Sequence, residues 1–204
     1  EYLRFIHGVV DSADLPLNIS RETLQDNLVF RKLKRFLTRR IIKFLADEAK
    51  RDPKQYASFW NTFGLYIKEG SVSDFENREE IASLLRFQSS AAEPGELISL
   101  DSYVARMREG QNDIYYLSGR SREEIDRGPY ISGFRKSGIE ALYLLEPIDD
   151  FVMNSLGEFQ KKKLVSADSA NIVLPPAAEK EIQEPPVPEK KMRNFLEWMK
   201  DSLG

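Results

Sequence analysis

Two short apolar runs separated by a helical stretch place the strongest constraint on how this chain folds. The runs DIYYLSG (113–119) and IEALYLLE (139–146) are rich in aromatic and aliphatic residues, which is typical of buried strands. Residues 121–138 between them have a helical pattern that a Gly-Pro pair interrupts. Because a strand, a helix and a second strand in this order form a right-handed crossover, the alternation predicts a small parallel sheet.

The same alternation continues on both sides of these two strands. We expect a capped helix over residues 99–110, another helix over residues 148–159 and a third strand in KKLVSA (162–167). The helices would then cover both faces of the sheet. The sequence therefore predicts an α/β fold in which residues 99–167 form a small αβα unit.

A series of helices is predicted ahead of this unit. An apolar stripe supports a helix up to about Arg51, and Asp52-Pro53 provides a cap followed by proline at the first helical position. NREEIASLLRF (77–87) has the pattern of a further helix, so we interpret residues 51–98 as a helical connector. Its aromatic residues occur at helical spacing, and we expect them to pack against neighbouring helices: Tyr56, Phe59, Trp60, Phe63 and Tyr66.

The composition changes after the αβα unit. Five of the ten prolines lie at 175–188 among Glu, Lys and Ala, which favours an extended linker over residues 168–190. Residues 191–204 then form a predicted amphipathic helix, whose apolar face carries Phe195, Leu196, Met199 and Leu203. Because this helix has nothing to pack on in its own segment and the chain lacks an initiator methionine, we expect it to be part of a longer protein.

Several kinds of site and segment are excluded because the residues, motifs or apolar runs that they require are missing from the sequence. The chain has no cysteine, which rules out disulfides, thiolate metal sites and a thiol nucleophile. Neither GxGxxG nor GxxxxGK[ST] occurs, so neither common phosphate-binding loop is present. No apolar run of about 18 residues occurs either, and we expect no membrane-spanning segment and no membrane partner.

The sequence offers little for metal or triad chemistry. His7 is the only histidine and lies in LRFIHGVV (3–10), an apolar run that indicates a buried strand. A structural role for His7 is favoured there, and one histidine cannot supply a multi-histidine metal site. Adjacent acidic residues such as Asp149 and Asp150 diverge around a helix, so we expect no metal site.

The run RKLKRFLTRRIIK (31–43) contains seven basic residues and no acidic one. A nucleic-acid-binding module acting through this run is the alternative function, because basic side chains bind phosphates. The favoured interpretation is the solvated face of an amphipathic helix whose core side chains are Leu33, Phe36, Leu37 and Ile41. The net charge of −3 gives no general attraction to nucleic acid, and no aromatic residues line the basic side for stacking on bases.

Several blocks of the chain resemble one known family. GVVDSADLPLNISRETLQ (8–25) closely resembles the most recognisable stretch of the middle domain of the heat-shock protein 90 chaperone family. LLRFQSS, SLDSYVARMREGQNDIYYLSG, GIEALYLLEPIDDFVMNSL and EFQKKKL resemble the same family in the same order and at similar spacing. The resemblance covers the chain from residue 1 to about residue 167.

This family consists of ATP-driven, dimeric chaperones with an N-terminal nucleotide domain, a middle domain and a C-terminal dimerisation domain. The resemblance implies that residues 1–50 are the end of the larger middle subdomain, with a catalytic loop at 11–25. It implies that 51–98 are the connector, 99–167 the smaller subdomain and 191–204 the first helix of the dimerisation domain. The full-length protein would be an ATPase that uses ATP with Mg; this fragment, which lacks the nucleotide domain, would be inactive alone.

The resemblance assigns the catalytic residues. Arg21 matches the arginine that reaches the γ-phosphate of ATP in the N-terminal domain, where its planar, permanently charged guanidinium would stabilise negative charge. Gln25 matches the supporting glutamine and lies one helical turn from Arg21, so the two share a face. Asn18 matches the asparagine that shapes the loop turn. The competing interpretation is that Arg21 is an ordinary surface arginine in a first helical turn.

A second group of residues matches the client-contacting segment of the family: Asp150, Phe151 and Asn154. From its spacing alone, Phe151 suits either the core or an exposed contact. Bacterial members often have Glu-Trp where this chain has Asp-Phe, and phenylalanine offers less area than tryptophan and lacks the N–H donor. We therefore expect client proteins to bind here, with a weaker or differently tuned contact.

The remaining partners and the compartment also follow from the resemblance. We expect the fragment's own N-terminal nucleotide domain and C-terminal dimerisation domain, co-chaperones, and a homodimer at full length, with no nucleic acid. DPKQYASFWNTFGLYIKEG and FLEWMKDSLG look more like the bacterial and mitochondrial members than the eukaryotic cytosolic ones. The sequence thus favours a mitochondrial protein, with a bacterial cytoplasmic protein as the alternative.

Overall fold

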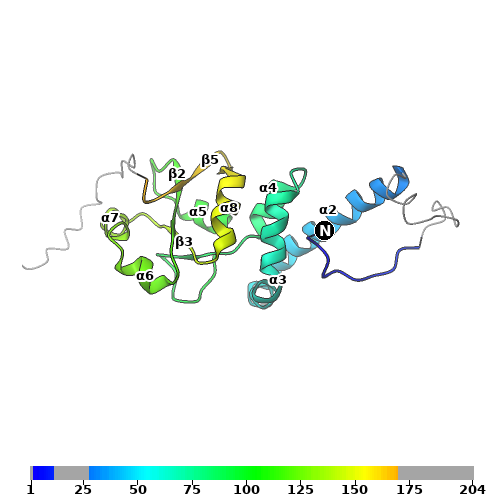
Figure 1. Cartoon of the computed structure of the whole chain (residues 1–204), viewed down its shortest axis with the longest axis horizontal. Coiled ribbons are helices and arrows are strands. Elements are labelled where there is room, and N and C mark those ends of the chain that lie inside the picture. The colour runs from blue at the N-terminus through cyan, green and yellow to red at the C-terminus, as the bar shows by residue number, and fades with distance from the viewer. Residues whose placement is uncertain (1, 12–27, 170–204) are drawn as a thin grey trace, which may run out of the picture.

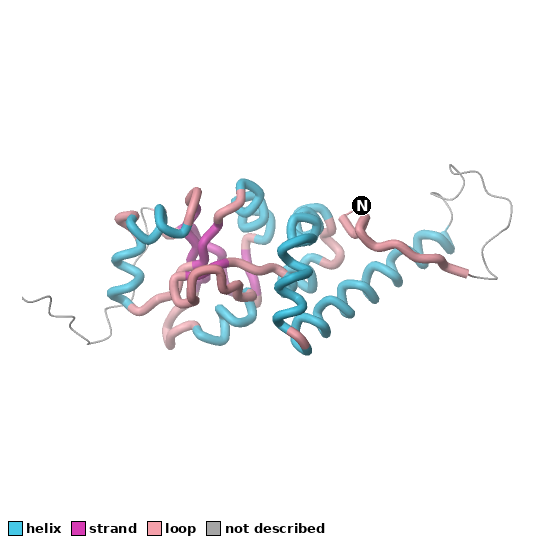
Figure 2. The backbone as a smooth tube through the Cα atoms, turned by 90° about the horizontal axis from the view of Figure 1, so that it is seen from below, coloured by secondary structure: helices cyan, strands magenta, loops and turns pink. Residues whose placement is uncertain are grey.

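The computed structural model describes residues 2–11 and 28–169 and shows a helical part beside an αβα unit (Figure 1). The helical part consists of α2 (Leu28–Arg51), α3 (Pro53–Ser73) and α4 (Arg78–Leu84). In both Figure 1 and Figure 2, α2 extends away from the αβα unit. Its N-terminal half therefore lies at the opposite end of the described molecule from the sheet.

The boundary between α2 and α3 lies where the sequence predicts it. Asp52 is the N-cap of α3, and its side chain accepts a hydrogen bond from the backbone nitrogen of Gln55 at 2.9 Å. Pro53 occupies the first turn, where a backbone N–H would have no helical partner. α4 ends at Leu84, earlier than predicted, because the chain then becomes extended and Phe87 forms a β-bridge.

Residues 3–10 do not form the predicted strand in the part of the chain that the structure describes. Leu3 and Phe5 pack against the helical core instead, with the rings of Phe5 and Phe63 of α3 stacked at a centroid distance of 4.8 Å, whereas Ile6, Val9 and Val10 are exposed. The hydroxyl of Tyr2 donates a hydrogen bond to Asp74 Oδ2 at 2.7 Å. The prediction was wrong because the start of the apolar run packs on a helix, and the residues that follow it are exposed.

The αβα unit contains a five-stranded sheet with the strand order β1-β3-β2-β5-β4. Its three central strands are parallel to one another: β2 (Asp113–Ser118), β3 (Leu142–Leu144) and β5 (Lys162–Ser166). This arrangement confirms the predicted parallel sheet and the α/β class. The edge strands β1 (Gln88–Ser89) and β4 (Glu158–Phe159) pair antiparallel, and the sequence does not predict them because two residues show no alternation.

Four short helices surround this sheet, as Figure 2 shows by the strands in magenta between helices in cyan. The predicted helix over 121–138 divides at its Gly-Pro pair. The helices are α5 (Leu100–Arg106), α6 (Arg122–Arg127), α7 (Ile131–Ser137) and α8 (Pro147–Leu156). Alternate side chains of β2 pack on opposite faces, Ile114 with α5 and α8, and Tyr115 with α6 and α7.

One hydrophobic core joins the helical part to the αβα unit. It includes Trp60 of α3 and Ile81 of α4 together with Leu142 of β3 and Met153 of α8. The aromatic packing predicted for α3 is confirmed for Tyr56 and Trp60, which are buried. Phe59 packs against the same core, and Phe59, Phe63 and Tyr66 also contact Phe5 of the N-terminal segment. The division of the chain into domains stays a prediction.

Candidate functional site

The residues predicted for the catalytic loop are Arg21, Gln25 and Asn18. All three lie outside the residues that the structure describes. Their spacing, one turn apart for Arg21 and Gln25, is a property of the sequence alone. Their catalytic roles therefore stay predictions.

The three residues predicted to contact clients lie on α8 and are exposed: Asp150, Phe151 and Asn154. Pro147 in the first turn starts this helix, and the backbone nitrogen of Glu146 donates to Asp149 Oδ2 at 3.0 Å, which caps it. The opposite side of the helix carries the buried side chains Val152, Met153 and Leu156. Because this apolar side packs on the sheet, the opposite side of α8 is exposed to solvent.

Exposure distinguishes between the two interpretations of Phe151. Its side chain is 69% exposed, so it is a surface aromatic and not part of the core. Asp150 accepts a hydrogen bond from the hydroxyl of Ser118, at the end of β2, at a distance of 2.6 Å. Asn154 lies one turn beyond, next to both residues on the helix surface. The structure thus brings the three predicted residues together on one exposed side of α8.

The first turn of α8 is attached to α3 by a buried cation that sequence reasoning missed. Lys68 is 3% exposed, and its Nζ lies 2.7 Å from Asp149 Oδ1 and 3.1 Å from Glu146 Oε2. The rings of Trp60 and Phe87 lie 5.7 Å from the same nitrogen. Burial raises the pKa of Asp149 above its ordinary value, and the positive charge of Lys68 opposes that rise.

A signal for Lys68 does exist in the sequence. Trp60, Gly64 and Lys68 are spaced by four residues, which places all three on one face of α3. A lysine on the apolar face of a helix requires a partner if the face is buried, because an unpaired buried ammonium is costly. Its partner, Asp149, lies far along the chain, and only the fold identifies it.

A second exposed aromatic residue lies near the C-terminal end of α8. Phe75, in the link between α3 and α4, is 74% exposed. The guanidinium of Arg78 lies over its ring at 4.3 Å from the centroid, and Arg78 Nη1 donates to the carbonyl oxygen of Ser155 at 2.9 Å. No feature of the sequence around Phe75 indicates this arrangement, because it depends on a residue in another part of the fold.

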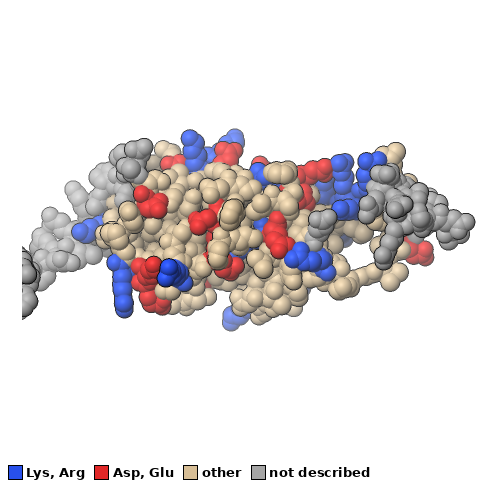
Figure 3. Space-filling view, in the orientation of Figure 1, with Lys and Arg blue, Asp and Glu red and all other residues tan. Residues whose placement is uncertain are grey.

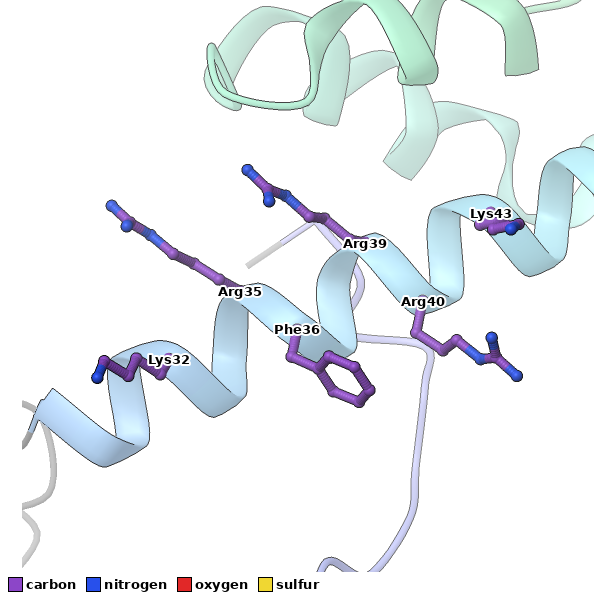
Figure 4. Close-up of a pocket in the computed structure, with 6 residues that line it drawn as sticks. All are labelled: Lys32, Arg35, Phe36, Arg39, Arg40 and Lys43. Carbon is purple, nitrogen blue, oxygen red and sulfur yellow. The ribbon is translucent and has the colours of Figure 1, made fainter.

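The basic run lies on α2, where it borders a shallow hollow of about 400 Å³ (Figure 4). The hollow is lined by Lys32, Arg35, Phe36, Arg39, Arg40 and Lys43. Figure 4 shows that these side chains point to different sides of the helix, and Figure 3 shows basic side chains gathered over α2. The basic residues are exposed, as the favoured interpretation predicts. Phe36, however, is 65% exposed, so its assignment to the core was wrong within the described residues.

Acidic residues lie close to this basic surface. Arg35 pairs with Glu76 at 2.7 Å. A wider groove of about 950 Å³ between α2, α4 and α5 has acidic as well as basic residues in its lining, including Asp47, Glu80 and Asp101. A surface of mixed charge gives less attraction to a phosphate backbone than the basic run alone suggests.

The described residues contain neither a candidate metal site nor a helix that could span a membrane. No cluster of three or more His, Cys, Asp or Glu side chains suited to a metal ion occurs among them. Likewise, none of the described helices is long and apolar enough to cross a membrane.

The whole chain, residues 1–204, matches the family model described as Hsp90 protein. It is 50% identical to the chaperone protein HtpG of Desulfotalea psychrophila over 204 residues, which cover 99% of this chain and 33% of the relative. The HtpG of Desulfitobacterium hafniense is 45% identical and that of Escherichia coli O1:K1 / APEC 42%, each over all of this chain and 33% of the relative. The chain thus spans about a third of the length of these relatives.

These three relatives bear on two of the predictions. All are named as chaperones, and none of their names gives support to the nucleic-acid alternative. All are bacterial proteins, which fits the bacterial alternative and gives no support to a mitochondrial location.

Proposed function

The chain belongs to the Hsp90 protein family, and from this premise we propose that it is the middle-domain segment of an ATP-dependent chaperone that assists protein folding in a bacterial cytoplasm. The proposal is supported by the match over all 204 residues and by relatives that are named as chaperones. Because those relatives are about three times longer, the activity would require domains beyond this chain.

The client-binding role rests on one observation, the exposure of Phe151. Leaving most of a phenyl ring in water forgoes about 1.5–3 kcal/mol of burial, which a partner that covers the ring recovers. Asp150 and Asn154 beside it offer a carboxylate and an amide for a ligand's backbone and side chains. An apolar ring flanked by polar groups suits non-native polypeptide, which exposes both apolar side chains and unpaired backbone.

The anchoring of α8 supports the same role. Lys68 holds Asp149 in the first turn, and the hydroxyl of Ser118 holds Asp150 at the end of β2. Phe151 follows these two carboxylates directly, so its position on the surface is set by contacts with α3 and with the sheet. A preorganised aromatic residue loses less entropy on binding than a mobile one.

The catalytic role rests on the family resemblance of the loop. ATP with Mg would be bound by the N-terminal nucleotide domain, and Arg21 would place its guanidinium on the γ-phosphate, with support from Gln25 and a turn shaped by Asn18. A guanidinium stays charged at any working pH and offers a planar set of donors to phosphate oxygens. The fragment alone would be inactive, and the complete protein would work as a homodimer together with co-chaperones.

The client-binding proposal is tested with Phe151→Ala in the full-length parent protein. Fluorescence anisotropy would measure the affinity for a labelled, permanently unfolded protein such as carboxymethylated α-lactalbumin. We expect the affinity to fall about threefold to tenfold, as truncation of an aromatic contact commonly does. Tyr130→Ala is the matched control, because Tyr130 is 52% exposed and lies on the other side of the sheet, at α7. Equal affinities for both variants and the wild type would contradict the proposal.

A further inference from the structure

We propose that Phe75 is a second aromatic contact for the polypeptide that α8 binds, and that the preferred ligand is an extended segment carrying apolar and basic side chains. The inference rests on the proposed function of α8 and adds one residue and the chemistry of the ligand. Phe75 lies outside α8, in the link between α3 and α4, and its side chain is more exposed than that of Phe151.

Arg78 ties Phe75 to the C-terminal end of α8. Its guanidinium lies over the Phe75 ring at 4.3 Å from the centroid, and its Nη1 donates to the carbonyl oxygen of Ser155 at 2.9 Å. Phe151 precedes Ser155 by one helical turn, about 6 Å along the axis, on the same face of the helix. The two exposed rings therefore belong to one local surface, although they come from different elements.

Two exposed rings on one local surface suit an extended ligand. A polypeptide in extended conformation advances by about 3.3 Å per residue, so a few residues span the step from the last turn of α8 to the link before α4. A folded protein has its aromatic side chains mostly inside and seldom offers two on one short extended segment. The arrangement thus favours unfolded or partly unfolded chains.

Stacking on Arg78 prepares Phe75 for binding. One side of its ring is covered by the guanidinium and the rest is exposed. This contact restricts the ring before any ligand arrives, which reduces the entropy lost on binding. Rigid aromatic side chains of this kind supply much of the affinity at protein interfaces.

The charges around the two rings favour a basic segment. Glu79 follows the Phe75 link and Asp150 precedes Phe151, and both are exposed. Within the described residues, no ion pair engages either of these two carboxylates. Two cations lie near Phe75, and both are already engaged: Arg78 by a ring and a carbonyl, and Arg35 by Glu76, the residue after Phe75. Lysine or arginine in the ligand would therefore meet uncompensated negative charge.

The test uses the full-length parent protein and two short labelled peptides. Both peptides carry two phenylalanines at the same positions, and the intervening residues are lysines in one and glutamates in the other. Fluorescence anisotropy would give the affinities of the wild type, Phe75→Ala and Phe151→Ala for each peptide. Tyr130→Ala serves as the matched control for loss of an exposed aromatic ring. Thermal melts would show that each variant is folded.

We expect the lysine peptide to bind the wild type more tightly than the glutamate peptide, and Phe75→Ala to weaken its binding about threefold to tenfold. Phe75→Leu keeps an apolar side chain without a flat ring, so it should lose less affinity for the lysine peptide than Phe75→Ala. If Phe151→Ala weakens binding and Phe75→Ala does not, this inference is wrong while the proposed function of α8 stands. If the peptides do not bind, this inference is wrong; if they bind and neither variant changes the affinity, both this inference and the proposed function of α8 are wrong. An equal affinity for the two peptides would overturn the preference for basic segments.

Discussion

Lys68 Nζ lies 2.7 Å from Asp149 Oδ1 with both side chains 3% exposed, so a buried ion pair attaches α8 to α3. The second carboxylate, Glu146, lies 3.1 Å from the same nitrogen, and the rings of Trp60 and Phe87 flank it. Desolvation of these charges is costly, and the pair remains favourable only while each charge keeps its partner. The pair as a whole therefore adds little to the free energy of unfolding, but removing one of its partners should lower that free energy strongly.

We expect Lys68→Met to lower the free energy of unfolding by about 3–5 kcal/mol. Methionine has a similar length and no charge, so the change leaves Asp149 buried without its closest cation. Urea denaturation of the chain, followed by circular dichroism, measures the effect.

Two further variants separate the ion pair from general packing. Lys68→Met combined with Asp149→Leu replaces both charges by apolar side chains and should recover much of the loss. Arg51→Ala breaks an exposed pair with Glu48 and should cost less than about 1 kcal/mol. If Lys68→Met is as mild as Arg51→Ala, the buried pair does not secure α8.

The hydrogen bond from Tyr2 to Asp74 predicts a dependence of stability on pH. Burial raises the pKa of Asp74, but hydrogen bonds from Asn77 and from the hydroxyl of Tyr2 outweigh burial and bring the pKa below its ordinary value of 3.8. A carboxyl whose pKa is lower in the folded state stabilises the fold above the unfolded pKa. That contribution is lost as the pH falls through the lower, folded pKa.

Tyr2→Phe removes only the hydroxyl donor and keeps the ring. Near neutral pH we expect it to lower the free energy of unfolding by about 0.5–1.5 kcal/mol. The difference from the wild type should shrink as the pH falls below the ordinary pKa of Asp74, because the protonated carboxyl accepts the bond less strongly. Urea titrations of both proteins at several pH values measure this difference in the free energy of unfolding. A difference that stays constant down to strongly acidic pH would show that Asp74 is not the group responsible.

Gly64 in α3 should resist replacement by alanine, although alanine is the better helix former. A Cβ atom at this position would lie 2.8 Å from Trp60 Cε2, and Trp60 is buried in the core and cannot easily move. Overpacking typically costs about 1–3 kcal/mol, whereas the gain in helix propensity is about 1 kcal/mol. We therefore expect Gly64→Ala to lower the melting temperature.

Two comparisons identify the cause. Ser58→Ala, at an exposed position of the same helix, should leave the melting temperature nearly unchanged. Gly64→Ala combined with Trp60→Phe should recover part of the loss, because phenylalanine is smaller. A rise in melting temperature for the single variant would mean that Trp60 has room to shift.

Local patterns predict most of the helices and the central strands of this fold. Asp52 and Pro53 mark the start of α3 because capping is a local interaction between neighbouring residues. The predicted strand at 3–10 fails for a complementary reason: Phe5 is apolar whether it packs in a sheet or on α3. The two-residue edge strands β1 and β4 are defined by hydrogen bonds to β3 and β5, and their own sequences are too short to show an alternation of apolar and polar residues.

The candidate client-binding residues are predictable only in part. The resemblance identifies Asp150, Phe151 and Asn154, but spacing alone leaves open whether Phe151 is buried, and the packing of α8 decides it. Lys68 and Phe75 are not identified, because each depends on a residue of α8 that lies more than 70 positions further along the chain. Contacts of this range are a property of the fold, and one sequence does not reveal them.

The role of Arg21 is tested by comparing the full-length parent protein with its Arg21→Ala variant. If the guanidinium stabilises the charge on the γ-phosphate mainly in the transition state, ATP binding should survive. Steady-state hydrolysis should fall about tenfold or more, equivalent to at least about 1.4 kcal/mol of transition-state stabilisation. Arg21→Lys should hydrolyse ATP little faster than Arg21→Ala, since an ammonium cannot reproduce the planar set of donors. Unchanged hydrolysis in Arg21→Ala would leave the family membership intact and make Arg21 an ordinary surface residue.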